Sequence, residues 1–225
     1  MKTFHIGGVH PAENKLSAAS PIREAALPKQ AVFSMFQHIG APAKPVVKKG
    51  DEVKVGTLLA EAGGFVSAPI YSSVSGKVSK VDVALDASGT RRMAVYVDVV
   101  GDEWEESIDR STTLVRLSDR PELDSKTIVE KVKDAGIVGM GGATFPCHVK
   151  LSPPPGCKAE CVIINAVECE PYLTADHRLM LEHPEEILVG LQLIMKAVDV
   201  KKGFIGIGKQ QARCHCCDDG EGKGL

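Results

Sequence analysis

The sequence changes character near residue 118, and this change most constrains the possible fold. From about Ala31 to about Leu117, short β-branched runs are split by Gly, Pro and Ser, as in "AKPVVKKGDEVKVG" and "VSAPIYSSVSGKV". Strands this short, with turns this frequent, predict an all-β unit. Beyond residue 118, helical and strand patterns alternate, which predicts an α/β unit with a mainly parallel sheet. We therefore expect an α+β chain in two parts.

The second part contains a readable series of elements. "DSKTIVEKVKDAG" has an N-cap candidate at Asp124 or Ser125 and a stop at Gly136, so it predicts a helix. A buried strand "CVIINA", a helix at about 175–181, a longer helix "PEEILVGLQLIMKAV" and a strand "KGFIGIG" follow. The expected divisions are an extended N-terminal segment over 1–30, the β domain over 31–117, the α/β domain over 118–207 and a tail over 208–225.

Composition removes several classes of function. The net charge of -2 gives no basic excess for nucleic acid. The first residues contain no apolar run typical of a signal peptide, and the longest apolar stretches are shorter than a membrane span. We expect a chain without transmembrane segments, which could bind a membrane partner. Without a secretory signal, the four internal cysteines are interpreted as cytosolic thiols: Cys147, Cys157, Cys161 and Cys169.

A glycine-rich stretch, "GIVGMGGATFPCHVK", is the first candidate for a binding site. Gly139, Gly141 and Gly142 remove side chains, so backbone N–H groups could approach an anion or a flat ring closely. Lys150 could then supply a positive charge to a phosphate. Glycine-rich turns are common, so this loop alone leaves an ordinary turn as an equal alternative.

A second group of polar residues follows the predicted strand "CVIIN". Asn165, Glu168 and Glu170 come just after its carboxyl end, where α/β folds bind ligands. The carboxylates can accept hydrogen bonds from hydroxyl or amide groups, although each could equally be a solvated loop residue. We expect the glycine loop to face Asn165 and Glu170 in one pocket.

The β domain resembles a lipoyl/biotinyl-type barrel-sandwich hybrid through "VKKGDEVKVGTLLAEA" and "VSAPIYSSVSGKV". In carriers of this type, the modified lysine lies at the tip of the hairpin between these halves. Here the tip is Gly63-Gly64 and the nearest lysine is Lys77. The resemblance therefore implies a structural or docking domain that is never lipoylated or biotinylated.

Five motifs together resemble the C subunit of the Rnf ion-translocating electron transport complex: "GGVHPAENK", "QHIGAPAKPVVKKGD", "GFVSAPI", "GIVGMGGATFP" and "NAVECEPYLTADHRLML". That family is similar in turn to the flavin subunit of respiratory complex I. The resemblance implies a Rossmann-like FMN domain, truncated near Gly206. It departs from the complex I pattern at Met140, Thr144 and Val167.

The resemblance also implies roles for individual residues. FMN contacts are implied at Gly139, Gly141, Gly142, Lys150 and Asn165, and NADH-side roles at Phe145, Glu168 and Glu170. No side chain is implied as a catalytic acid or base, because the flavin carries the chemistry.

The implied function is electron input into an ion-translocating membrane complex. Hydride would pass from NADH to FMN, and single electrons would leave through iron–sulfur clusters toward a ferredoxin-type carrier. Two 4Fe-4S clusters are expected in the intact subunit, but none on this chain, which we expect to be inactive alone. The implied location is the cytoplasmic face of the inner membrane, bound to the other Rnf subunits.

Two alternatives stay open at this stage. The chain could be a non-catalytic hybrid-barrel scaffold that docks on a membrane redox complex. It could also resemble the A subunit of the sodium-pumping quinone reductase, although the intact "GMGGATFP" argues against that.

The last residues, "GKQQARCHCCDDGEGKGL", abandon the family pattern. The cluster of Cys214, His215, Cys216 and Cys217 has the residue types of a metal site. However, one choice of codons for these residues, read in a frame shifted by one nucleotide, yields a turn followed by an Ala/Met/Lys-rich helix, as the fold requires. Our hypothesis is that residues from about Gly208 onward are read out of frame, so the cluster binds no metal.

Overall fold

The computed structural model describes residues 11–86 and 88–208 of the 225-residue chain. The described residues form two compact units. One contains residues 11–24, 160–195 and 200–208, and the other contains residues 25–86, 88–159 and 196–199. Among the described residues, no helix has the length and apolar character needed to cross a bilayer.

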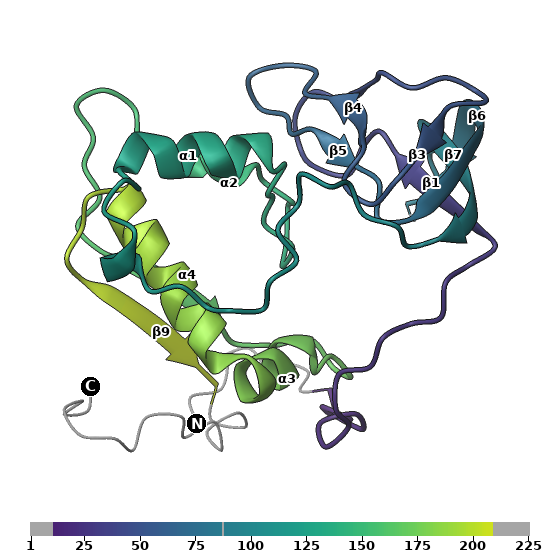
Figure 1. The fold of residues 1–225 in the computed structure, drawn as a ribbon. Coiled ribbons are helices and arrows are strands. Elements are labelled where there is room, and N and C mark those ends of the chain that lie inside the picture. Colours follow the sequence, from purple (N-terminus) through teal and green to yellow (C-terminus); the bar gives the residue numbers. More distant parts are fainter. Residues whose placement is uncertain (1–10, 87, 209–225) are drawn as a thin grey trace. The chain divides into compact units, whose positions relative to one another are not determined.

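Seven strands build the hybrid barrel in two antiparallel sheets (Figure 1). One sheet has the order β1-β7-β6-β3 and the other the order β2-β4-β5. The strands are β1 (Gln30–Ser34), β2 (Lys44–Pro45), β3 (Glu52–Val53), β4 (Leu58–Glu61), β5 (Ile70–Tyr71), β6 (Ser75–Leu85) and β7 (Arg91–Gly101). The predicted all-β unit is confirmed, and its short strands account for the frequent turns.

The barrel core follows from side chains that alternate along the long strands. Val95 and Val97 of β7 are completely buried, while Asp98, the next residue along the strand, faces solvent. Leu59 of β4 and Val78 of β6 are also buried and belong to the same cluster. Removing this apolar surface from water is the main source of the barrel's stability.

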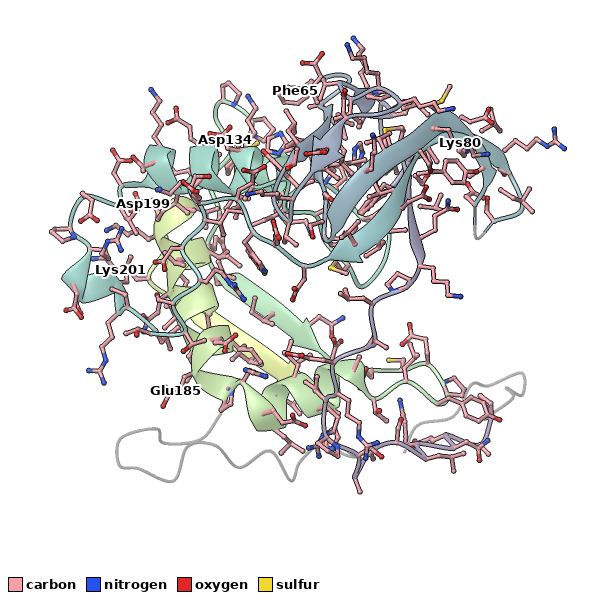
Figure 2. The ribbon with its side chains drawn as sticks, turned by 45° about the vertical axis from the view of Figure 1, so that its right-hand side comes forward. Phe65, Lys80, Asp134, Glu185, Asp199 and Lys201 are labelled. Atoms are coloured by element: carbon pink, nitrogen blue, oxygen red, sulfur yellow. The ribbon has the colours of Figure 1, made fainter. Side chains whose placement is uncertain are left out.

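The loop between β4 and β5 contains the position where carriers bear their lysine. Gly63 lies in this loop, and a Cβ there would come within 2.0 Å of the Pro42 carbonyl oxygen. Phe65, labelled in Figure 2, is 81% exposed in the same loop. Lys77 lies instead within β6, where its register partners on the neighbouring strands are Glu52 of β3 and Asp98 of β7. The predicted absence of modification stays a prediction.

Helix α1 (Ser125–Asp134) confirms the helix predicted from "DSKTIVEKVKDAG". Asp124 caps it, because its carboxylate accepts a hydrogen bond of 2.7 Å from the Thr127 amide. The chain leaves the helix through Gly136, whose φ of +68° suits glycine. A Cβ on Gly136 would lie 2.4 Å from the Pro69 carbonyl oxygen, so the residue is fixed against the barrel. Two shorter helical elements are η1 (Leu117–Asp119) and α2 (Cys147–Lys150).

The other unit contains two parallel strands, β8 (Val162–Ala166) and β9 (Gly203–Ile207). Between them in sequence are α3 (Ala175–Glu182) and α4 (Pro184–Ala197). Figure 1 shows α4 alongside β9. A Cβ on Gly203 would lie 2.6 Å from the Met195 sulfur, so α4 packs tightly on this strand. The predicted strand–helix–helix–strand order and parallel pairing are confirmed.

The expected divisions at residues 30 and 117 stay predictions. The compact units do not follow them: residues 11–24 group with residues 160–195, and residues 118–159 group with the barrel. The proposed out-of-frame tail lies outside the described residues, apart from Gly208.

Candidate functional site

The glycine loop, residues 139–145, is closed at its base by its own backbone. Val138 and Pro146 form an antiparallel bridge. The Gly139 amide donates to the Phe145 carbonyl at 2.9 Å, and the Cys147 amide donates to the Ile137 carbonyl at 3.0 Å. The two ends of the loop are therefore fixed at the start of α2.

The tip of this loop has unpaired backbone amides in the part of the chain that the structure describes. A Cβ added to Gly141 or Gly142 would meet no atom of the described residues within 4 Å, and neither residue has a positive φ. Within the part of the chain that the structure describes, the amides of Gly141 and Gly142 donate no hydrogen bond. Neither backbone conformation nor packing explains glycine here. Two free donors without side chains suit the close approach of an anionic or flat ligand.

The residues around this loop differ in exposure. Met140 is 91% exposed at the tip, while Phe145 is half-buried at the base. Lys150, the last residue of α2, is exposed. Burial raises the pKa of the Cys147 thiol, and the Lys150 charge opposes this shift. The thiol therefore remains protonated at neutral pH, and Lys150 places a positive charge at the end of α2.

The acidic loop, residues 167–174, links β8 to α3. Glu168 in this loop is buried, and both of its carboxylate oxygens accept backbone hydrogen bonds. One binds the Asp176 amide at 2.9 Å and the other binds the His177 amide at 3.1 Å. Thr174 is at the N-cap position but makes no capping hydrogen bond, so Glu168 caps α3.

Asn165 and Glu170 are both exposed to solvent. The Asn165 side-chain oxygen accepts from the Val167 amide at 3.1 Å, and its NH2 group makes no hydrogen bond among the described residues. Within the described ranges, the Glu170 carboxylate makes no hydrogen bond. Burial, followed by the charges of Glu168 and Glu170, raises the pKa of Asp176. The loop thus concentrates negative charge and leaves one carboxylate available to a ligand.

The N-terminal segment, residues 13–22, holds the acidic loop and was missed by sequence reasoning. The Lys15 ammonium donates to the carbonyls of Glu170 at 2.8 Å, Leu173 at 2.7 Å and Glu168 at 3.3 Å. The motif "PAENK" contains this lysine, but nothing in its spacing points to a loop more than 150 residues away.

The two loops belong to different compact units. The expectation that the glycine loop faces Asn165 and Glu170 therefore stays a prediction. Among the described residues, no group of three or more His, Cys, Asp or Glu side chains could hold a metal ion. Cys214, His215, Cys216 and Cys217 lie outside the described residues.

Two family models match this chain. One, described as the RnfC barrel sandwich hybrid domain, matches residues 2–102. The other, described as the Nuo51 FMN-binding domain, matches residues 132–215 and so includes the glycine loop and the acidic loop. Its match extends past Gly208, where the hypothetical out-of-frame tail begins. Fold and matches together define the class: a barrel-sandwich hybrid followed by a domain of the FMN-binding type.

Curated relatives specify the family. The C subunit of the Na(+)-translocating ferredoxin:NAD(+) oxidoreductase complex of Acetobacterium woodii is 48% identical over 89% of this chain and 44% of its own length. The C subunit of the proton-translocating complex of Clostridium ljungdahlii is 47% identical over 92% of this chain and 44% of its length. The C subunit of the ion-translocating oxidoreductase complex of Rhodobacter capsulatus is 40% identical over 92% of this chain and 40% of its length.

Over about nine-tenths of its length, the chain is similar to Rnf-type C subunits, and its first part matches the family model of their barrel sandwich hybrid domain. It covers less than half the length of these relatives.

Proposed function

We propose that this chain forms the flavin-holding portion of an electron-input subunit in an ion-translocating redox complex. The single observation that carries the proposal is the tip of the glycine loop. Two amide donors there have no partner among the described residues, on glycines that packing does not require. This loop lies within the match to an FMN-binding domain.

FMN fits the groups that the glycine loop presents. The amides of Gly141 and Gly142 would donate to an anionic or carbonyl oxygen of the flavin, and Lys150 would add a positive charge. Bound FMN would supply hydride acceptance and single-electron release. The protein would hold the flavin ring and keep bulky side chains away from it. The hydrogen bond between Gly139 and Phe145 closes the base of the loop and so fixes the position of its tip.

The acidic loop is the proposed contact region for the dinucleotide NADH. The Glu170 carboxylate would accept hydrogen bonds from hydroxyl or amide groups of NADH, and the NH2 group of Asn165 would donate. Glu168 was expected on this side too, but its carboxylate caps α3, so we propose that it acts by fixing the loop. No step requires a side chain to hold or move a proton.

The proposed partners are the other subunits of an Rnf-type complex at the cytoplasmic face of the inner membrane. Electrons would pass between NADH, FMN and iron–sulfur clusters carried elsewhere in the complex, toward a ferredoxin-type carrier. The names of the relatives, which include ferredoxin:NAD(+) oxidoreductase complexes, support this proposal.

Titration of the chain with FMN, followed by flavin fluorescence, tests the proposal. We expect saturable binding, and we expect Gly141→Val to weaken it about tenfold or more, equivalent to about 1.4 kcal/mol. The valine meets no protein atom within 4 Å of its Cβ, so it should leave the fold intact.

The matched control is Gly190→Ala in α4, where an added Cβ also meets nothing within 4 Å. This variant should bind FMN as the native chain does. Absence of flavin binding by the native chain would favour the non-catalytic scaffold, and equal affinity in Gly141→Val would remove the glycine loop from the site.

A further inference from the structure

The N-terminal segment binds the acidic loop at several points besides Lys15. The Tyr172 amide donates to the Glu13 carbonyl at 2.8 Å, and the Asn14 side-chain amide donates to the Tyr172 hydroxyl at 3.2 Å. The hydroxyls of Ser17 and Thr174 are 2.7 Å apart. The segment therefore contacts the loop from Glu168 to Thr174, both through its backbone and through its side chains.

Lys15 is the charged centre of this contact. An ammonium group has three N–H donors, and three loop carbonyls surround it. All of its donors are satisfied by protein, so Lys15 is not available to bind a ligand directly. Its charge lies beside the acidic loop, which carries Glu168 and Glu170. There it offsets negative potential and holds the carbonyls of three residues together.

The acidic loop holds a strained backbone at the same place. Tyr172 has a φ of +69°, which is uncommon for a residue with a bulky side chain. Such a conformation costs about 1–3 kcal/mol and persists where its surroundings fix it. Here the surroundings are Glu13 and Asn14, so the loop's shape depends on the N-terminal segment.

We propose that Lys15 is a positioning residue for dinucleotide binding: it fixes the acidic loop so that the Glu170 carboxylate is presented to the nicotinamide nucleotide. This inference rests on the proposed function. The carbonyl of Glu170 is one of the three that Lys15 binds, so the ammonium acts on the residue whose carboxylate is free. Without the ammonium, the loop would lose the conformation that Lys15 holds. The nucleotide would then have to order the loop on binding, which weakens its affinity.

The test uses the full chain and two separate titrations, one with FMN and one with NAD(+), which does not reduce the flavin. We expect Lys15→Met to weaken NAD(+) binding about tenfold while FMN affinity stays within about twofold of native. Lys15→Arg, which keeps the charge and the donors, should restore most of the NAD(+) affinity. Lys158→Met, a change at an exposed lysine, should alter neither.

The outcomes separate the two proposals. If the native chain binds no FMN, the proposed function fails. If it binds FMN but not NAD(+), or if Lys15→Met lowers the melting temperature while leaving NAD(+) affinity unchanged, this inference alone is overturned. Should Lys15→Met not fold, Lys15→Gln takes its place, since it keeps two donors without the charge. An intermediate loss of NAD(+) affinity supports the proposal, and native affinity overturns it.

Discussion

The glycine loop and the acidic loop are constrained in opposite ways. The glycine loop is tied only at its base, by hydrogen bonds between its own ends, and its tip has free amides. The acidic loop is held along its length by Lys15 and Tyr172 contacts, while Glu168 links it to α3. One loop is fixed by neighbours in sequence, and the other by a segment more than 150 residues away.

Because of this difference, an unbonded polar group has a different origin in each loop. In the glycine loop, the amides of Gly141 and Gly142 are free because no acceptor among the described residues reaches the tip. In the acidic loop, three carbonyls and the Glu168 carboxylate are bonded within the protein, whereas the Glu170 carboxylate has no hydrogen bond among the described residues. Rigid surroundings are what a binding group needs to keep its geometry.

The largest expected effect separates Gly136, where the chain leaves α1, from the tip of the glycine loop. Gly136→Ala should lower the free energy of unfolding by about 3 kcal/mol, because it combines a positive φ with a clash against the Pro69 carbonyl. Gly141→Ala should change it by less than about 0.5 kcal/mol. Urea denaturation of both variants measures the difference. Equal effects would mean that the loop tip is as tightly constrained as Gly136.

A smaller effect is expected in the acidic loop. Glu168→Gln should lower the free energy of unfolding by about 1–2 kcal/mol, because an amide offers one acceptor oxygen and no charge to the N-terminus of α3. Glu170→Gln serves as the matched control and should have an effect below about 0.5 kcal/mol. Thermal or urea unfolding can compare the pair. A cost at Glu170 as large as that at Glu168 would contradict the division of roles between them.

The smallest effect concerns pH. The pKa of Asp176 is raised, so its ionised form is less favourable in the folded protein than in the unfolded chain. Asp176→Asn should therefore be slightly more stable than the native chain at pH 7, by less than about 0.5 kcal/mol because the group is largely exposed. This gain in stability should decrease as the pH falls through the raised pKa of the folded state. It should be absent below the usual pKa range of aspartate, where the side chain is protonated in both states. Urea denaturation at several pH values checks this, and a gain that persists in acid would exclude the charge of Asp176 as its cause.

The sequence predicted the elements whose signals are local. Asp124 and Gly136 marked the ends of α1 correctly, because capping and a left-handed stop involve residues within a few positions. The glycine loop and Glu170 were selected from local patterns too, and their roles in binding stay predictions. The position of the loops relative to each other has no local signal, and that prediction remains untested.

The contacts that sequence reasoning missed are long-range. Glu168 is of a residue type that often binds ligands, and only the fold shows that its carboxylate is directed to the start of α3. Lys15 is an ordinary lysine in sequence, whereas in the structure three carbonyls surround it. An alternating pattern can predict which side of a strand is buried, but no pattern in a single sequence pairs one lysine with three distant carbonyls.

The hydrogen bond between Lys15 and Leu173 joins residues 158 positions apart, which has a consequence for synthesis on the ribosome. The hybrid barrel contains its own core and can fold while the rest of the chain is being made. The N-terminal segment leaves the ribosome first, yet its partner loop follows only after the barrel and α1 have emerged. At about 5–20 residues per second, that interval is roughly 8–30 seconds. During this time the segment's donors face water, so this contact should be among the last to form.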